Sequence, residues 1–214
     1  MILTLALAAS LAVTAQVGSV PPGAPAVPPD AKMALQSFDA RSRTIRDFTA
    51  KFTQTYRSGA LGRAIVETGT VKVKRPSKMI FEYLVPEKKL FVADGDSYYF
   101  YFPRDKQVVV QNQRGDKRVI ARVLAEGHLL ENFKCVGEER DPLGRKLLLA
   151  PLENDPSVTR IALILDAQLR LVALEIQDAE GSTSRMVFDS LKENPGLKDV
   201  EFRFEVPKGV EVIS

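Results

Sequence analysis

The dominant feature of the sequence is a long series of short segments in which apolar and polar residues alternate. A period of two is typical of strands that bury one face. Tight-turn signals such as Asp94-Gly95-Asp96 and Asn194-Pro195-Gly196 separate the segments. Many short strands joined by tight turns predict an antiparallel meander. The expected strands are residues 48–56, 64–74, 79–84, 89–93, 97–102, 107–111, 134–138, 146–150, 159–165, 171–176, 184–190 and 201–206.

Two segments with helical spacing interrupt or precede this alternation. Asp30 can cap a helix that runs to about residue 46, with apolar residues recurring at Met33, Leu35, Phe38, Ile45 and Phe48. A second, short helix is expected within residues 119–130, where Gly127 can end it. Its apolar face consists of Val119, Ile120, Val123 and Leu124. A short amphipathic helix in the middle of a meander has to lie over one face of the sheet.

The N-terminus has the composition of a targeting segment. Residues 1–15 form an apolar run that ends in Val13-Thr14-Ala15, which resembles a signal-peptide cleavage pattern, although no Lys or Arg precedes the run. We therefore expect a signal peptide over residues 1–15, a Pro-rich linker over residues 16–29 and one folded domain over residues 30–214. Because no Cys follows the apolar run to carry a lipid anchor, we expect a soluble protein in the periplasm.

Composition argues against most catalytic and nucleic-acid functions. The formal net charge is only +3, and basic residues alternate with acidic ones, so no nucleic-acid partner is expected. His128 and Cys135 are the only residues of their types in the chain, which is too few for a Cys/His zinc site. No phosphate-binding glycine loop or nucleophile elbow is present. We therefore expect no metal, no cofactor and no enzymatic activity.

The strand alternation places apolar residues on one face of the predicted sheet. Charged residues such as Lys72, Lys74, Glu82 and Arg203 occupy the other parity. This face is either a solid core or, since only two helices cover it, the wall of a dry cavity suited to acyl chains. The residues expected to line such a cavity are Val71, Val73, Met79, Phe81, Tyr83, Phe91, Leu163, Leu174, Phe202 and Phe204.

Arg75 is exceptional because it shares the strand parity of Val71 and Val73. A buried guanidinium is costly without acceptors, and the C-terminal carbonyls of a covering helix are natural partners for it. Alternatively, the strand ends at Lys74, before Pro76, and Arg75 is solvated. The spacing alone leaves both interpretations open.

Several of these segments together resemble a known family. They are Gly69-Thr70-Val71-Lys72-Val73-Lys74-Arg75-Pro76, Phe81-Glu82-Tyr83, Phe91-Val92-Ala93-Asp94-Gly95 and Tyr98-Tyr99-Phe100-Tyr101, with Phe48 to Gln54 upstream and Phe202 to Val210 near the C-terminus. In this order they resemble the outer-membrane lipoprotein carrier family LolA. The resemblance spans residues 48–210.

The resemblance implies a mainly β fold with some helix, namely an incomplete antiparallel β-barrel with an N-terminal helix and a short helical lid over an apolar cavity. It implies that Arg75 holds the lid shut and that Phe81 is a cavity aromatic. The implied protein is a monomer that carries the acyl chains of lipoproteins between an inner-membrane ABC-type releasing complex and an outer-membrane lipoprotein receptor. Two alternatives use the same fold: a carrier or exporter partner for another lipid, such as a glycolipid, and a lipoprotein-sensing regulator.

Overall fold

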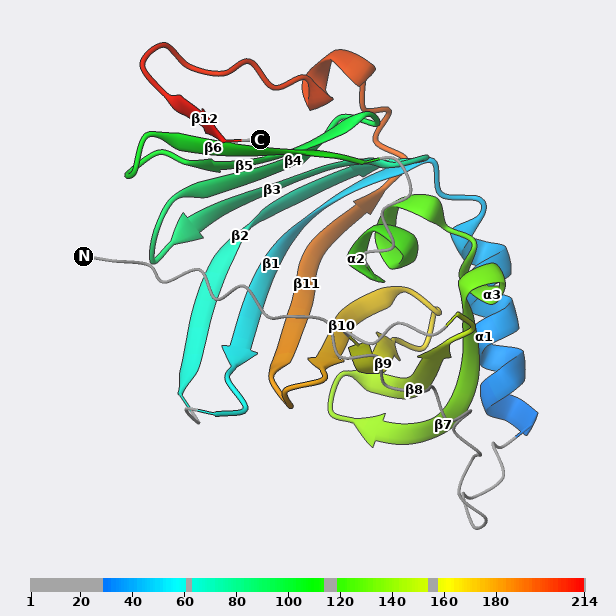
Figure 1. The fold of residues 1–214 in the computed structure, drawn as a ribbon. Helices are drawn as coiled ribbons and strands as arrows, with labels where there is room; N and C mark the ends of the chain where they lie inside the picture. Colours follow the sequence, from blue (N-terminus) through cyan, green and yellow to red (C-terminus); the bar gives the residue numbers. More distant parts are fainter. Residues whose placement is uncertain (1–28, 61–62, 114–118, 154–157, 214) are drawn as a thin grey trace.

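The computed structural model describes residues 29–60, 63–113, 119–153 and 158–213, which form one strongly curved twelve-stranded sheet (Figure 1). The expected signal peptide and nearly all of the expected linker lie outside the described residues. The strands are β1 (Asp47–Arg57), β2 (Ala64–Lys74), β3 (Lys78–Val85), β4 (Lys89–Ala93), β5 (Ser97–Phe102), β6 (Gln107–Asn112), β7 (Phe133–Asp141), β8 (Gly144–Pro151), β9 (Val158–Leu165), β10 (Leu171–Asp178), β11 (Thr183–Glu193) and β12 (Glu211–Ile213).

The strand order in the sheet is β12-β6-β5-β4-β3-β2-β1-β11-β10-β9-β8-β7. The chain thus runs outward from the central β1 to β6, crosses to β7 at the opposite edge, and returns to β11 beside β1. The predicted meander and the mainly β fold with two helical regions are confirmed, and the described strands form an open sheet. One correction concerns the last pair: β12 joins β6 in parallel, so the sheet is not purely antiparallel.

The expected strand over residues 201–206 is wrong. The chain forms a short 3-10 helix, Asp199–Phe202, and then continues without regular structure until β12. The side chain of Glu201 accepts a hydrogen bond from the backbone N–H of Lys198 at 2.9 Å, which closes this turn. The alternation at residues 201–206 was misleading because a strand also needs a neighbouring strand with which to form backbone hydrogen bonds. The edge of β6 that could pair with residues 201–206 is occupied by β12.

The N-terminal helix α1 (Pro29–Ser42) begins one residue before the expected cap, at the last residue of the expected linker, and ends earlier than residue 46. Its apolar stripe contains Ala31, Ala34, Leu35 and Phe38 and is buried, whereas Met33, which the spacing grouped with the stripe, is exposed. Tight backbone hydrogen bonds from Thr44 and Ile45 end the helix and turn the chain into β1. In the described part of the chain no helix is both long and apolar enough to cross a membrane.

The crossing segment between β6 and β7 supplies the second helical region. It consists of α2 (Val119–Ala121), a π-helical turn (Arg122–Glu126) and, after Gly127, α3 (Leu129–Asn132). We call residues Val119–Glu126 the lid helix, because this segment lies on the concave side of the sheet (Figure 1). Gly127 has a φ of 73°, a left-handed conformation that ends the lid helix as its spacing predicts.

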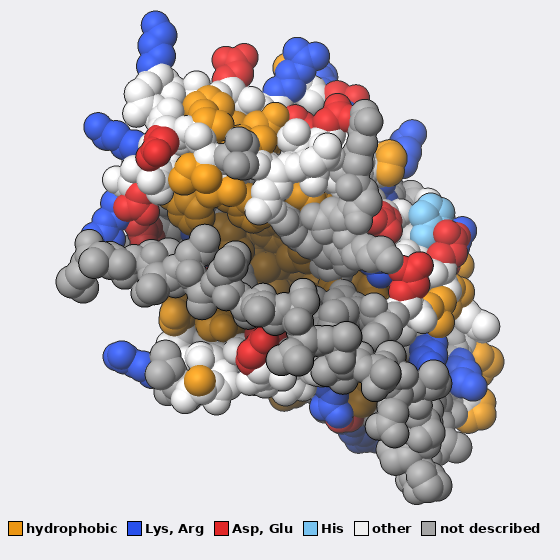
Figure 2. Space-filling model, viewed as in Figure 1, with side chains coloured by type: hydrophobic (Ala, Val, Ile, Leu, Met, Phe, Trp, Pro, Cys, Tyr) orange, Lys and Arg blue, Asp and Glu red, His pale blue; other side chains and the backbone are white. Residues whose placement is uncertain are grey.

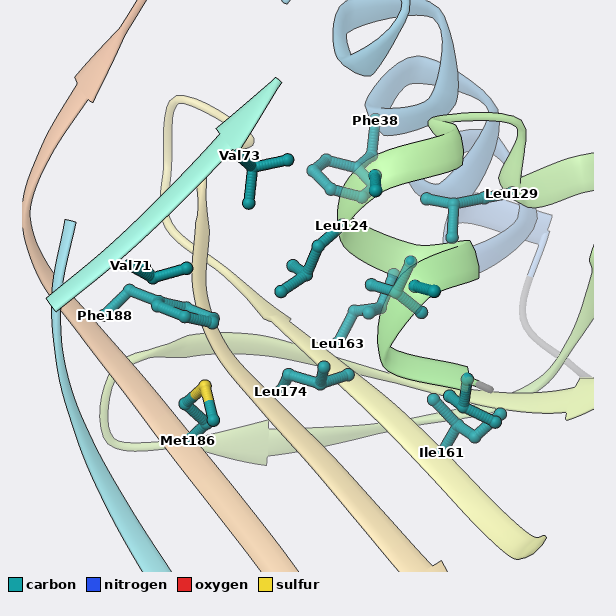
Figure 3. Close-up of a cluster of buried hydrophobic side chains, with 14 of the residues drawn as sticks. Phe38, Val71, Val73, Leu124, Leu129, Ile161, Leu163, Leu174, Met186 and Phe188 are labelled. Carbon is teal, nitrogen blue, oxygen red and sulfur yellow. The ribbon is translucent and has the colours of Figure 1, made fainter. Parts of the chain in front are cut away.

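The hydrophobic core lies between the lid helix, α1 and the concave face of the sheet. Leu124 points from the lid helix toward residues on several strands, and Phe38 of α1 lies beside it (Figure 3). The sheet side of this core includes Val71, Val73, Leu163, Leu174, Met186 and Phe188, all buried. Full burial of each such side chain contributes about 1.5–3 kcal/mol, so this packing holds the lid helix against the sheet.

A candidate lipid cavity and its lid

The concave face is hollowed next to the lid helix. A cavity of about 270 Å³ is lined by Phe81, Tyr83, Lys89, Leu90, Phe91, Phe100, Phe102 and Ile120. Strands β3, β4 and β5 provide its wall, and Ile120 closes it from the lid helix. In the space-filling view, hydrophobic side chains form the floor of a hollow on this face (Figure 2).

The structure divides the residues expected to line the cavity into three groups. Phe81, Tyr83, Phe91 and, from the lid helix, Ile120 line it. A second group is buried in the core beneath the lid helix and α1 and does not line the cavity. Its members on the sheet are Val71, Val73, Met79, Leu163 and Leu174, and its members on the lid helix are Val119, Val123 and Leu124. The third group, Phe202 and Phe204, was assigned to the wrong face of the sheet.

The ring contacts of Phe204 establish this correction. Phe204 packs against Tyr99 at 5.1 Å and Tyr101 at 5.7 Å between ring centroids. These tyrosines alternate with Tyr98 and Phe100, which face the concave side, so they point to the convex side. Phe202 is buried in the same C-terminal segment, outside the core cluster under the lid. The reason for the error is the missing strand: without a β-ladder, residue parity does not assign a face.

Aromatic rings make up much of the cavity wall. Phe91 packs against Phe100 with 5.0 Å between ring centroids, and Phe81 contacts Phe52 at 5.6 Å and Phe91 at 6.1 Å. Such rings present large apolar surfaces that stay in defined positions. The wall therefore suits a hydrocarbon ligand.

A strip of polar side chains crosses the concave face at the edge of this wall, and we call it the mouth strip. It consists of Ser184, Gln54, Glu67, Tyr83 and Lys89. The Tyr83 hydroxyl donates to Gln54 Oε1 at 2.8 Å, and Gln54 Nε2 donates to Ser184 Oγ at 2.9 Å. The Lys89 ammonium lies 2.6 Å from Glu67 Oε1 and 4.3 Å from the Tyr83 ring centroid. Burial, followed by the negative charge of Glu67, raises the pKa of Tyr83, so the phenol remains a neutral donor.

Arg75 joins the sheet to both helical regions. Its Nε donates to the Leu124 carbonyl of the lid helix at 3.2 Å, and its Nη1 donates to the carbonyls of Ile45, at 3.0 Å, and Ser42. The structure thus favours the buried interpretation of Arg75 over the solvated one. Burial lowers the pKa of Arg75 to about 10, which still leaves the guanidinium charged at neutral pH. The guanidinium is half-buried, and the carbonyls at the helix ends supply the acceptors that it requires there.

Gly127 permits this arrangement because its backbone lies against the Arg75 guanidinium. A methyl group added at Gly127 would lie 2.9 Å from Arg75 Cζ. The guanidinium is at the end of a flexible side chain, so it would move aside and lose its bond to Leu124.

We expect Gly127→Ala to lower the free energy of unfolding by about 1–3 kcal/mol, through left-handed strain plus displacement of Arg75. Gly181→Ala is the matched control, since Gly181 has a similar φ of 80° with no atom within 4 Å of an added Cβ. Urea unfolding of both variants separates the two contributions. Equal losses would show that Arg75 is not displaced.

Asp39 anchors α3, which follows the lid helix, to α1. Its side chain is 4% exposed; Oδ1 accepts the backbone N–H of Leu129 at 2.7 Å, and Oδ2 accepts Arg43 Nε at 2.9 Å. The carboxylate therefore fixes the start of α3, so that the lid helix is held by Arg75 on one side of Gly127 and by Asp39 on the other.

Asp39→Ala should lower the free energy of unfolding by about 1–3 kcal/mol, because it leaves a buried N–H at Leu129 without its acceptor. Asp105→Ala, at an exposed turn, removes a carboxylate from the surface and serves as control. The measurement is the urea concentration at the midpoint of unfolding, compared between variants whose free energy of unfolding depends equally on urea concentration. A change no larger than that of the control would contradict the anchoring role.

Asp39 and most of the mouth strip were not among the predicted site residues, although the sequence contains signals for them. Asp39 is a carboxylate beside Phe38, at the border of the apolar stripe of α1. Gln54, Glu67 and Lys89 share strand parity with the inward Phe52, Val71 and Phe91. A polar residue at an inward position next to an apolar face marks a functional candidate.

Within the described ranges, no group of three or more His, Cys, Asp or Glu side chains is arranged to hold a metal ion. Cys135 is half-buried in β7, and burial raises the pKa of its thiol.

Comparison with known proteins identifies relatives over most of the chain. The family model described as outer membrane lipoprotein carrier protein LolA matches residues 43–205. The chain is 33% identical over 184 residues to an outer-membrane lipoprotein carrier protein of Cupriavidus necator, covering 84% of this chain and 85% of that one. It is 28% identical over 178 residues to the carrier of Hahella chejuensis, covering 80% and 83%. An uncharacterized conserved protein from Thermus thermophilus has a similar fold, with a TM-score of 0.52 at 17% identity over 84% of this chain and 98% of that one.

Proposed function

The chain belongs to the LolA family of outer-membrane lipoprotein carriers, which are transport proteins and not enzymes; on that premise we propose that it binds the acyl chains of lipoproteins between the lid helix and the sheet. It takes up this cargo at the inner membrane, crosses the periplasm as a monomer and delivers the cargo to the outer membrane. The observation that carries the proposal is the apolar, aromatic cavity beneath a helix that is bonded by the half-buried Arg75.

The size of the cavity supports a carrier with two states. At about 270 Å³ it is smaller than the pockets of about 300–1,000 Å³ that hold drug-sized ligands. Several acyl chains need more room, which displacement of the lid helix from the core beneath it would provide. Burial of hydrocarbon supplies about 0.8 kcal/mol per methylene, so acyl chains offset the contacts that are lost on opening.

Arg75 is proposed as the gate between the two states. In the closed state its guanidinium bonds carbonyls on the lid helix and after α1. Opening breaks the bond to Leu124, and closing restores it. The gate therefore favours the empty, closed protein and helps to expel the lipid at delivery. The proposed donor of the cargo is an ABC-type releasing complex, and the proposed acceptor is an outer-membrane lipoprotein receptor.

The cargo is tested by identifying what co-purifies with the protein. The full chain is isolated from the periplasm, and bound material is analysed by mass spectrometry. Acyl chains attached to an N-terminal cysteine peptide are expected. Free glycolipid in their place would favour a carrier for another lipid. Recovery of the protein from the membrane fraction and not from the soluble periplasmic fraction would contradict the proposed transit through the periplasm.

A further inference from the structure

The cavity has a charged residue at its edge whose charge is already neutralised. Among the described residues that line the cavity, Lys89 alone is charged. Its ammonium is 2.6 Å from the carboxylate of Glu67, with side-chain exposures of 32% for Lys89 and 15% for Glu67. A sheltered pair of this kind is screened less by water and salt than an exposed one. The mouth strip therefore has both signs of charge but little net charge.

The register shows that this pairing is built into the sheet. Glu67 on β2 lies opposite Gln54 on β1, and Lys89 on β4 lies opposite Tyr83 on β3. Tyr83 lies between the two charged residues and fixes Lys89 from below through its ring. Because strands hold these positions, the ion pair is not a chance encounter of two mobile surface side chains.

An unpaired lysine at this position would attract ligands with anionic heads. A lysine at the edge of an apolar cavity is a natural binding group for a fatty-acid carboxylate or a phospholipid phosphate. With Glu67 in place, an anionic head has to displace a carboxylate or lie beside it. An uncharged ester or amide carbonyl avoids this conflict, since the ammonium has three N–H donors and can bond a carbonyl while keeping Glu67.

We propose that Glu67 is a specificity-determining residue which, by pairing with Lys89 at the mouth of the cavity, selects acyl chains attached through uncharged ester or amide groups over acyl chains with anionic heads. This inference rests on the proposed function of the cavity. The proposed function concerns the acyl chain, which contacts the cavity wall. The inference concerns the polar end of the ligand, which contacts the mouth strip.

The test uses two probes with the same chain and different heads, a fluorescent fatty acid and its methyl ester, titrated into the full chain below micelle-forming concentrations. Wild type should bind the ester at least as tightly as the acid. Glu67→Gln, which keeps the shape and removes the charge, should raise the acid-to-ester affinity ratio about fivefold. The double variant Glu67→Gln/Lys89→Gln should lose that gain, because the cation is gone.

The matched control is Glu82→Gln. Glu82 is exposed on the opposite face of β3, so this variant changes the net charge equally without touching the mouth strip. An acid-to-ester affinity ratio that is the same in Glu67→Gln and wild type, with both probes bound, overturns the inference but not the proposed function. If wild type binds neither probe, the proposed function itself fails and the inference with it.

Discussion

Arg75→Leu is expected to accept acyl cargo but to deliver it to acceptor membranes about tenfold or more slowly than wild type. In the closed state the guanidinium donates to the carbonyls of Leu124, Ile45 and Ser42, and leucine donates to none of them. A hydrogen bond to a charged group contributes about 1.5–3 kcal/mol, and about 1.4 kcal/mol changes an equilibrium tenfold. Loss of these bonds therefore shifts the balance toward the open, loaded state, in which cargo is retained.

The assay has two steps: loading from donor membranes, then transfer to acceptor membranes. Arg104→Leu is the control, because Arg104 is 78% exposed and its contact with Glu87 is long, at 3.6 Å. Arg75→Lys should also deliver poorly, since a point charge cannot bond separated carbonyls as the planar guanidinium does. Delivery by Arg75→Leu at the wild-type rate would mean that the arginine supports the fold without gating.

Phe81→Glu is expected to weaken binding of a hydrophobic dye by at least about tenfold, because it places a charge on the apolar wall. Phe81 is 2% exposed and packs against Phe52 and Phe91, so the substitution also lowers the free energy of unfolding. Phe91→Glu is the second variant. Phe91 lines the same cavity but is only partly buried, so the variant retains more stability.

The control for both wall variants is Phe204→Glu. Phe204 has the same aromatic ring but lies on the convex side, against Tyr99 and Tyr101. The Phe204→Glu variant should therefore bind the dye as wild type does. Each variant is checked by circular dichroism before titration. If folded Phe91→Glu binds dye as tightly as wild type, the concave wall is not the binding surface.

Strand parity was the most informative property of the sequence, because one face of a sheet receives every second residue. It placed Phe81, Tyr83 and Phe91 on the concave side. For Arg75 it gave the parity of Val71 and Val73 but left open whether the side chain is solvated, and the structure shows it bonded to the lid helix. It failed for Phe204, where the same alternation occurs without a neighbouring strand. Parity is thus reliable only where backbone hydrogen bonds fix the ladder.

Partners brought together by topology were harder to predict. A carbonyl of a covering helix was one of two interpretations for Arg75, and Leu124 provides it, but Arg75 also bonds the carbonyl of Ser42 at the end of α1 and that of Ile45 in the connection between α1 and β1. No side-chain pattern indicates that these backbone atoms lie beside Arg75. The π-helical turn of the lid helix was also not predicted, because the apolar face of residues 119–124 fits either kind of helix.

The most direct test of acyl-chain binding in this cavity is photo-crosslinking with a lipoprotein whose acyl chain carries a diazirine. The loaded complex is irradiated, digested and analysed by mass spectrometry. Crosslinks are predicted at Phe81, Phe91, Phe100 and Ile120, which surround the cavity. Crosslinks concentrated at Phe204 and its convex-side neighbours, with none at these four residues, would contradict the account.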